Sequence, residues 1–183
     1  MIRIGSFFAV CLVVLLGLLG PGLGAQTVYL TPEEALKLIF PGSAVAIESK
    51  TLTPEQKKEI DKLLGAKLKK DDWGFYVARS GHRVDGYALL DTETGKTEPI
   101  TFMTAILPSG RVKEVEVLIY REAYGSEVRG KGFLKQFEGK GPEHALQVGK
   151  DIGNITGATL SSQAVTRGVK RALILWKTLY GVR

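Results

Sequence analysis

The middle of the chain contains four strand-like segments that very short turns join. These segments are rich in β-branched and aromatic residues and cover residues 73–79, 86–91, 99–107 and 111–120. Residues 94–96 (TGK) and 108–110 (PSG) are typical of hairpin turns. Such turns join antiparallel neighbours, because a parallel connection needs a crossover of about a dozen residues or more. The pattern therefore predicts an antiparallel sheet and argues against a doubly wound nucleotide-binding fold.

Two helix starts before the sheet share the same local chemistry. Residues 31–34 (TPEE) and 53–56 (TPEQ) each offer a threonine as the cap and a proline at the first helical position. Each also offers a Glu or Gln that can bond back to the cap amide. These motifs predict helices over 32–39 and 54–64, and a short strand around residues 45–49 lies between them.

The chain closes with an amphipathic helix. Over residues 162–179, apolar side chains recur at helical spacing and basic side chains occupy the other face. Ser161 or Ser162 is expected to cap its start. We expect an α+β domain over 73–183, in which an antiparallel sheet is flanked by two short N-terminal helices and one long C-terminal helix. Residues 26–72 are expected to form a helical N-terminal extension of that domain.

A shortage of cysteine and histidine limits which cofactors the chain can hold. Cys11 is the only cysteine, and His82 and His144 are the only histidines. Cysteine-bound zinc, iron–sulfur clusters and covalently attached haem all need more cysteines than this. Two isolated histidines also make a Ser-His-Asp hydrolase an unfavourable hypothesis. We expect no metal site, so any redox chemistry would need an organic cofactor.

The N-terminal segment has the pattern of an export signal. Arg3 precedes the 13-residue apolar stretch Phe7–Leu19, and residues 21–25 end in small side chains suited to a signal peptidase. This stretch is shorter than the roughly 20 residues that a membrane-spanning helix needs. We expect residues 1–25 to be a cleaved signal peptide, with an N-terminal anchor as the alternative. Either way, the rest of the chain is expected to be exported to the periplasm or the extracytoplasmic face of the membrane.

Positive charge exceeds negative charge, with 25 lysine and arginine residues against 19 aspartate and glutamate residues. The two signs are interspersed, and no strand alternates aromatic and basic residues as an RNA-binding sheet does. We therefore expect no nucleic-acid partner. We expect the net positive charge to attract an anionic partner electrostatically.

A loop rich in glycine and hydroxyl groups leads into the last helix. Residues 151–162 read DIGNITGATLSS. Small residues let a ligand approach the backbone, and the helix N-terminus that follows offers free amides and the positive end of its dipole to a phosphate. The local chemistry alone favours a simpler interpretation, in which this loop is a well-capped helix start.

Residues 155–162 (ITGATLSS) closely resemble the flavinylation signature of the FMN-binding domain family. This family includes flavin-carrying subunits of sodium-pumping NADH:quinone reductase and of Rnf-type complexes, and small secreted electron carriers. The resemblance covers roughly residues 75–180. It implies that the cofactor is FMN and that the protein is an electron carrier or redox subunit rather than a self-contained enzyme. Its implied redox partners are membrane or envelope proteins.

In this family, the last threonine of the signature carries FMN through a phosphoester bond. A magnesium-dependent FAD:protein FMN transferase installs the group from FAD. The resemblance assigns that role to Thr159 and implies that backbone amides around 156–161 surround the phosphate. It also implies that the glycine-rich region 121–137 borders the flavin ring. The predicted cofactor-binding residues are Thr156, Gly157, Ala158, Thr159, Leu160, Ser161, Tyr120, Glu122 and Val128.

One position departs from the family pattern. The family usually has aspartate six residues before the flavinylated threonine, where this chain has Gly153, and the nearest acid is Asp151. If that carboxylate assists the transferase or its metal, its loss would slow or prevent the modification. Two alternatives therefore stay open, which are FMN held noncovalently and a secreted binding or scaffold module with a degenerate flavin site.

Overall fold

The computed structural model describes residues 27–181, so the predicted signal peptide or anchor over 1–25 lies outside the described residues. Its elements are β1 (Thr27–Val28), α1 (Pro32–Ile39), β2 (Ala44–Thr51), α2 (Pro54–Leu64), β3 (Asp72–Ser80), β4 (Arg83–Thr94), β5 (Pro99–Ile106), β6 (Val112–Tyr120), η1 (Ser126–Arg129), α3 (Lys131–Leu134), η2 (Lys135–Phe137) and α4 (Thr159–Tyr180). This arrangement confirms the predicted α+β class. Across residues 27–181, no helix has the length and apolar character needed to span a bilayer.

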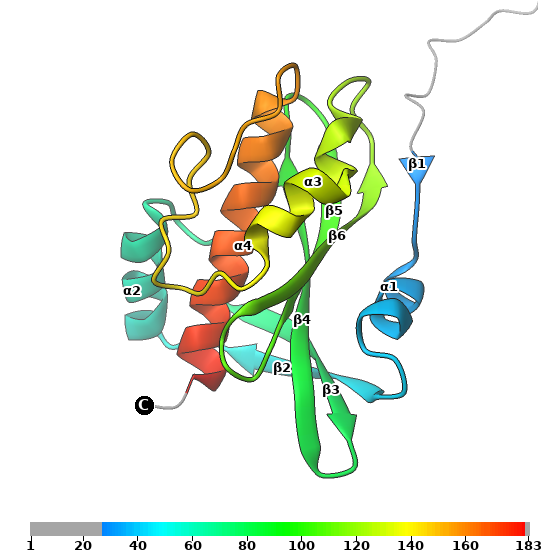
Figure 1. Cartoon of the computed structure of the whole chain (residues 1–183). Helices are drawn as coiled ribbons and strands as arrows, with labels where there is room; N and C mark the ends of the chain where they lie inside the picture. The colour runs from blue at the N-terminus through cyan, green and yellow to red at the C-terminus, as the bar shows by residue number, and fades with distance from the viewer. Residues whose placement is uncertain (1–26, 182–183) are drawn as a thin grey trace, which may run out of the picture.

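All six strands form one antiparallel sheet in the order β1-β6-β5-β4-β3-β2. The four central strands follow one another along the chain, and two of their three connections lie at the predicted turns (Figure 1). Both edge strands come from the segment before residue 72, because β1 pairs with β6 and β2 pairs with β3. The segment predicted as a helical extension thus also completes the sheet at both edges. The domain boundary at residue 73 stays a prediction.

The helices α1 and α2 start at the two capping motifs predicted from the sequence. Thr31 Oγ1 accepts a hydrogen bond from Glu34 N, and Thr53 Oγ1 accepts one from Gln56 N. Both capping boxes are complete, and the helices span 32–39 and 54–64 as predicted. These starts need no tertiary contact, because every group in the motif lies within one turn.

The sheet packs against helices on both faces (Figure 1). The larger core lies between one face and the helices α4, α2 and α3, and the smaller core lies between the other face and α1. Phe102 and Met103, which are adjacent in β5, illustrate the division. They are both fully buried but belong to different cores, because successive side chains of a strand point to opposite faces.

A bulge in β6 changes which face its last residues occupy. Simple alternation predicts Val115, Val117 and Ile119 on one buried face. Val115 and Val117 do lie in the α4-side core, but the register with β5 then shifts and leaves Leu118 as an extra residue. Leu118 is buried in the α1-side core, and Ile119 packs against that same core. The expectation for Ile119 was therefore wrong, since one inserted residue reverses the alternation.

The start of α4 also differs from the sequence-based expectation. The helix begins at Thr159, three residues before Ser162, and its N-cap is Ala158, which makes no side-chain capping bond. The prediction of Ser161 or Ser162 as the cap was wrong, because both side chains lie inside the first turn and are buried. A helix that starts without a side-chain cap leaves its first amides available to another acceptor.

Candidate functional site

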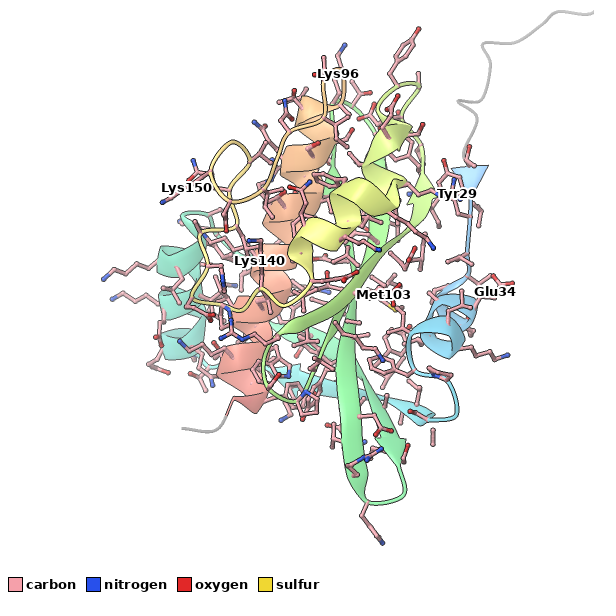
Figure 2. The ribbon with its side chains drawn as sticks, viewed as in Figure 1. Tyr29, Glu34, Lys96, Met103, Lys140 and Lys150 are labelled. Atoms are coloured by element: carbon pink, nitrogen blue, oxygen red, sulfur yellow. The ribbon has the colours of Figure 1, made fainter. Side chains whose placement is uncertain are left out.

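A cleft of about 950 Å³ opens beside the start of α4. Its walls come from the β4–β5 hairpin, the stretch after β6 and the first turn of α4. Figure 2 shows Lys96 of the hairpin at the same end of the molecule as the start of α4. The volume is within the usual range for small-molecule sites. The lining residues are Lys96, Thr97, Glu98, Arg121, Glu122, Ala123, Tyr124, Gly157, Ala158, Thr159, Leu160 and Ser161.

The first turn of α4 offers backbone donors at one wall of the cleft. The first backbone hydrogen bond of the helix runs from Ser162 N to Ala158 O at 2.8 Å, so the amides of 159–161 have no acceptor within the helix. Gly157, just before the helix, has φ +85°, and a Cβ built there would meet nothing within 4 Å. Glycine adopts this conformation at little cost and keeps the approach to the amides open. Unpaired amides at the positive end of a helix dipole favour an anion such as phosphate.

Thr159 is the first residue of α4 and is exposed. Asn154 Nδ2 donates a hydrogen bond to Thr159 Oγ1 at 2.9 Å. Neither His82 nor His144 lines the cleft. The Thr159 hydroxyl therefore has no imidazole beside it to remove its proton, and its reaction as a nucleophile would need a base from elsewhere.

Tyr120 lies behind the cleft wall rather than in it. Its hydroxyl donates to the carbonyl oxygen of Tyr124 at 2.5 Å and lies 2.9 Å from Ser161 Oγ. Burial raises the pKa of the Tyr120 phenol, which stays protonated and able to donate at neutral pH. These contacts join the stretch after β6 to the first turn of α4, so Tyr120 sets the spacing between two walls of the cleft.

Glu122 holds the third wall in place. Its carboxylate accepts hydrogen bonds from Thr97 N at 2.7 Å, Glu98 N at 2.9 Å and Thr97 Oγ1 at 3.1 Å. Burial raises the pKa of Glu122, but these donors outweigh burial, and the net result is a lowered pKa. The carboxylate is ionised at neutral pH and fastens the β4–β5 hairpin to the end of β6.

Partly buried charges hold α4 against β4. Arg171 Nε and Nη2 bond Asp91 Oδ2 at 2.9 and 2.5 Å, and Arg171 also pairs with Glu93. Arg167, which is more exposed, reaches Glu93 at 3.2 Å. Burial lowers the pKa of Arg171, but the charge of Asp91 outweighs it and raises that pKa. The guanidinium thus stays charged and fixes the helix that carries Thr159.

The structure brings six of the nine predicted residues to the cleft: Gly157, Ala158, Thr159, Leu160, Ser161 and Glu122. Tyr120 supports the wall from behind. Val128 is fully buried in the α4-side core, because the apolar residue of the short helix η1 packs inward. Thr156 is exposed on the loop but does not line the cleft.

Sequence reasoning missed the hairpin side of the site. Lys96 was interpreted only as part of a turn, and Thr97 and Glu98 were not assigned to the site. Arg121, Ala123 and Tyr124 fall in the region 121–137 that the resemblance placed at the flavin ring, whereas residues 125–137 do not line the cleft. A topological signal was nevertheless present. Because β5 and β6 are antiparallel neighbours, β6 ends at the same end of the sheet as the turn between β4 and β5, so these segments lie close together.

Comparison with known proteins gives matches over the same region. Residues 95–174 match the model of the FMN-binding domain family. The chain is 33% identical over 112 residues to the G subunit of the proton-translocating ferredoxin:NAD(+) oxidoreductase complex of Clostridium ljungdahlii, which covers 57% of this chain and 59% of that protein. It is 26% identical over 135 residues to the G subunit of the Na(+)-translocating ferredoxin:NAD(+) oxidoreductase complex of Acetobacterium woodii, which covers 67% of this chain and 65% of that protein. The chain thus spans less than two thirds of either relative.

A solved structure shares the fold. The crystal structure of Shewanella oneidensis NqrC superposes with a TM-score of 0.55 at 16% sequence identity and covers 80% of this chain and 87% of that one. The family match over 95–174 includes every residue that lines the cleft.

Proposed function

Since residues 95–174 belong to the FMN-binding domain family, we propose that this chain carries FMN in the cleft at the start of α4 and serves as an electron carrier. The family match confirms the predictions of the family and of FMN as the cofactor. Bound flavin supplies the acceptance and release of electrons, while the protein fixes its position and polarity.

The position of Thr159 carries the proposal of a covalent link. Thr159 is exposed and lines the cleft, next to the amides of 159–161 that lie before the first backbone hydrogen bond of the helix. A phosphate esterified to Oγ1 would lie beside those amides and the positive end of the helix dipole. Lys96 adds a positive charge to the lining. The donors and the volume of the cleft both fit a phosphate joined to a flavin.

Attachment is proposed to require a modifying enzyme. No imidazole lines the cleft beside the Thr159 hydroxyl, so FAD:protein FMN transferase would supply the base and the magnesium ion. Exposure of Thr159 supports this proposal, because an enzyme must reach the oxygen.

The proposed setting is a membrane redox complex at its extracytoplasmic face. Two relatives are named as subunits of ferredoxin:NAD(+) oxidoreductase complexes, which supports membrane or envelope proteins as electron partners. The export-signal pattern over residues 1–25 supports the extracytoplasmic side. A cleft open to solvent suits electron exchange, because a partner must approach the flavin edge.

Co-expression with a flavin transferase tests the proposal. We expect a band that fluoresces after denaturing electrophoresis and a flavin adduct on the peptide that contains Thr159. Thr159→Val should abolish the adduct, because it removes the only atom to which the phosphate would be esterified. Thr92→Val, at an exposed threonine of β4 that does not line the cleft, is the matched control and should remain fluorescent.

Two results would contradict the covalent link. Flavin that copurifies but dissociates on denaturation would favour noncovalent FMN. A colourless protein with no adduct and no affinity for added FMN would favour the binding or scaffold alternative.

A further inference from the structure

Asn154 contacts the oxygen to which FMN is proposed to be attached. Its Nδ2 donates to Thr159 Oγ1 at 2.9 Å, across five residues of the loop, and both residues are exposed. We propose that Asn154 is a positioning residue that holds the Thr159 hydroxyl for transfer of the FMN phosphoryl group. The inference rests on the proposed covalent attachment at Thr159.

The direction of this hydrogen bond suits a nucleophile. A threonine hydroxyl has one proton and two acceptor lone pairs, and the Asn154 amide occupies one of those lone pairs. The proton and the second lone pair remain available. An N–H donor also stabilises the negative charge that develops on Oγ1 as its proton leaves.

The transfer itself balances in atoms and charge. A bond forms between Thr159 Oγ1 and the flavin-side phosphorus of FAD, and the bond from that phosphorus to the bridging oxygen of the pyrophosphate breaks. AMP leaves with the bridging oxygen, and the hydroxyl proton goes to a base of the transferase. No oxidant or reductant is needed. Asn154 exchanges no proton in this step and acts only through its hydrogen bond to Thr159 Oγ1.

The loop around Asn154 is anchored, so its amide has a defined position. Ile152 is buried and bridges to Val148, and Gly153 N donates to Gln136 Oε1 of η2 at 2.6 Å. These contacts hold the two residues before Asn154 against the rest of the domain. At position 153, where the family usually has aspartate, the glycine has no side chain to reach Thr159. The contact with the Thr159 hydroxyl comes from the neutral side chain of the next residue, Asn154.

Steady-state kinetics of the transferase reaction test the proposal, with intact-mass detection of the adduct. Full-length wild type, Asn154→Ala and Asn154→Leu serve as acceptors at saturating FAD and Mg²⁺. Loss of one orienting hydrogen bond should lower kcat roughly tenfold and leave the KM for the acceptor protein within about twofold. Gln147→Ala is the matched control, since it removes an exposed amide side chain that does not line the cleft, and its kcat should stay at the wild-type value.

The possible outcomes are distinct. A normal kcat for both Asn154 variants would overturn the proposal, and so would a raised KM at unchanged kcat, which would indicate recognition by the transferase. The urea midpoint should stay at the wild-type value, because Asn154 is exposed, and a fall in both kcat and midpoint would indicate a structural role and overturn the proposal. A wild type that accepts no flavin would overturn covalent attachment itself, and the role of Asn154 with it.

Discussion

At the scale of single residues, Glu122 does the most to assemble the cleft. Its carboxylate accepts three hydrogen bonds from Thr97 and Glu98, which lie in the turn between two other strands. The resemblance pointed to this residue as a border of the flavin ring. The structure shows in addition that it fastens the hairpin that carries Lys96.

Glu122→Ala should therefore loosen the hairpin and lower stability. We expect the free energy of unfolding to fall by about 1–2 kcal/mol, because two backbone amides and one hydroxyl lose a charged acceptor. Amide hydrogen exchange at Thr97 and Glu98 should accelerate. Urea denaturation and exchange measured by NMR check these two effects.

Glu127→Ala is the control for this prediction, since it removes an exposed carboxylate from η1. Its effect should stay within about 0.5 kcal/mol. Equal effects of the two substitutions would show that the hydrogen bonds to Glu122 contribute nothing to the stability of the hairpin.

At the level of elements, α4 carries Thr159, the proposed attachment residue, so the packing of α4 on the sheet positions the candidate site. A Cβ at Gly168 would lie 2.1 Å from Phe102 Cζ, so the glycine lets α4 lie close to β5. One turn later along the helix, Arg171 inserts between the carboxylates of Asp91 and Glu93. Close packing and buried charge together fix the position of the helix.

Arg171→Ala should destabilise the fold because it leaves Asp91 and Glu93 without their buried partner. We expect a loss of about 3 kcal/mol, at the lower end of the range for buried pairs, since the side chain of Arg171 is 18% exposed. Arg167→Ala removes a guanidinium from the same helix with 54% exposure and should cost about 1 kcal/mol or less. Urea denaturation of both variants gives the comparison. Similar losses would argue against the buried cluster as the anchor of α4.

At the level of the whole molecule, acid should weaken two segments, which are the loop over 146–151 and the β4–β5 hairpin that lines the cleft. Burial raises the pKa of Asp151, but hydrogen bonds from the amides of Gln147 and Leu146 outweigh it and lower that pKa, and the pKa of Glu122 is lowered in the same way. A carboxyl group whose pKa is lower in the folded state adds stability above its unfolded pKa, which is about 4. That contribution is lost as the pH falls through the folded pKa.

We therefore expect these two groups to leave the free energy of unfolding nearly constant from about pH 7 to pH 5 and to lower it below about pH 4. Urea midpoints measured across this range check the prediction. In Asp151→Asn, the urea midpoint should fall less steeply below about pH 4, because the substitution removes one of the titrating groups. If the urea midpoint of this variant fell as steeply with pH as that of the wild type, Asp151 would not contribute to the loss of stability in acid.

Local sequence was sufficient wherever the structure depends on neighbours in the chain. The two capping boxes set the starts of α1 and α2, and short turns set the antiparallel order of the four central strands. The signature over 155–162 located five of the residues that line the cleft. Each of these features lies within a few residues of its cause, so a pattern in the sequence can report it.

The remaining features depend on contacts that form only in the folded chain. The bulge that turns Leu118 inward depends on pairing with β5, and α4 starts at Thr159 with Ser161 and Ser162 buried in its first turn. The hydrogen bond from Asn154 to Thr159 Oγ1 joins residues five apart, but a contact with Gln136 of η2 holds the loop that carries Asn154. The hairpin wall formed by Lys96 and its neighbours depends on the hydrogen bonds from Thr97 and Glu98 to Glu122, which join residues 25 and 24 positions apart. The sequence alone was sufficient to predict the class of fold and the resemblance to the FMN-binding domain family, which residues 95–174 match. Tertiary packing determined which groups enclose that site, because their contacts join segments whose separation along the chain carries no local pattern.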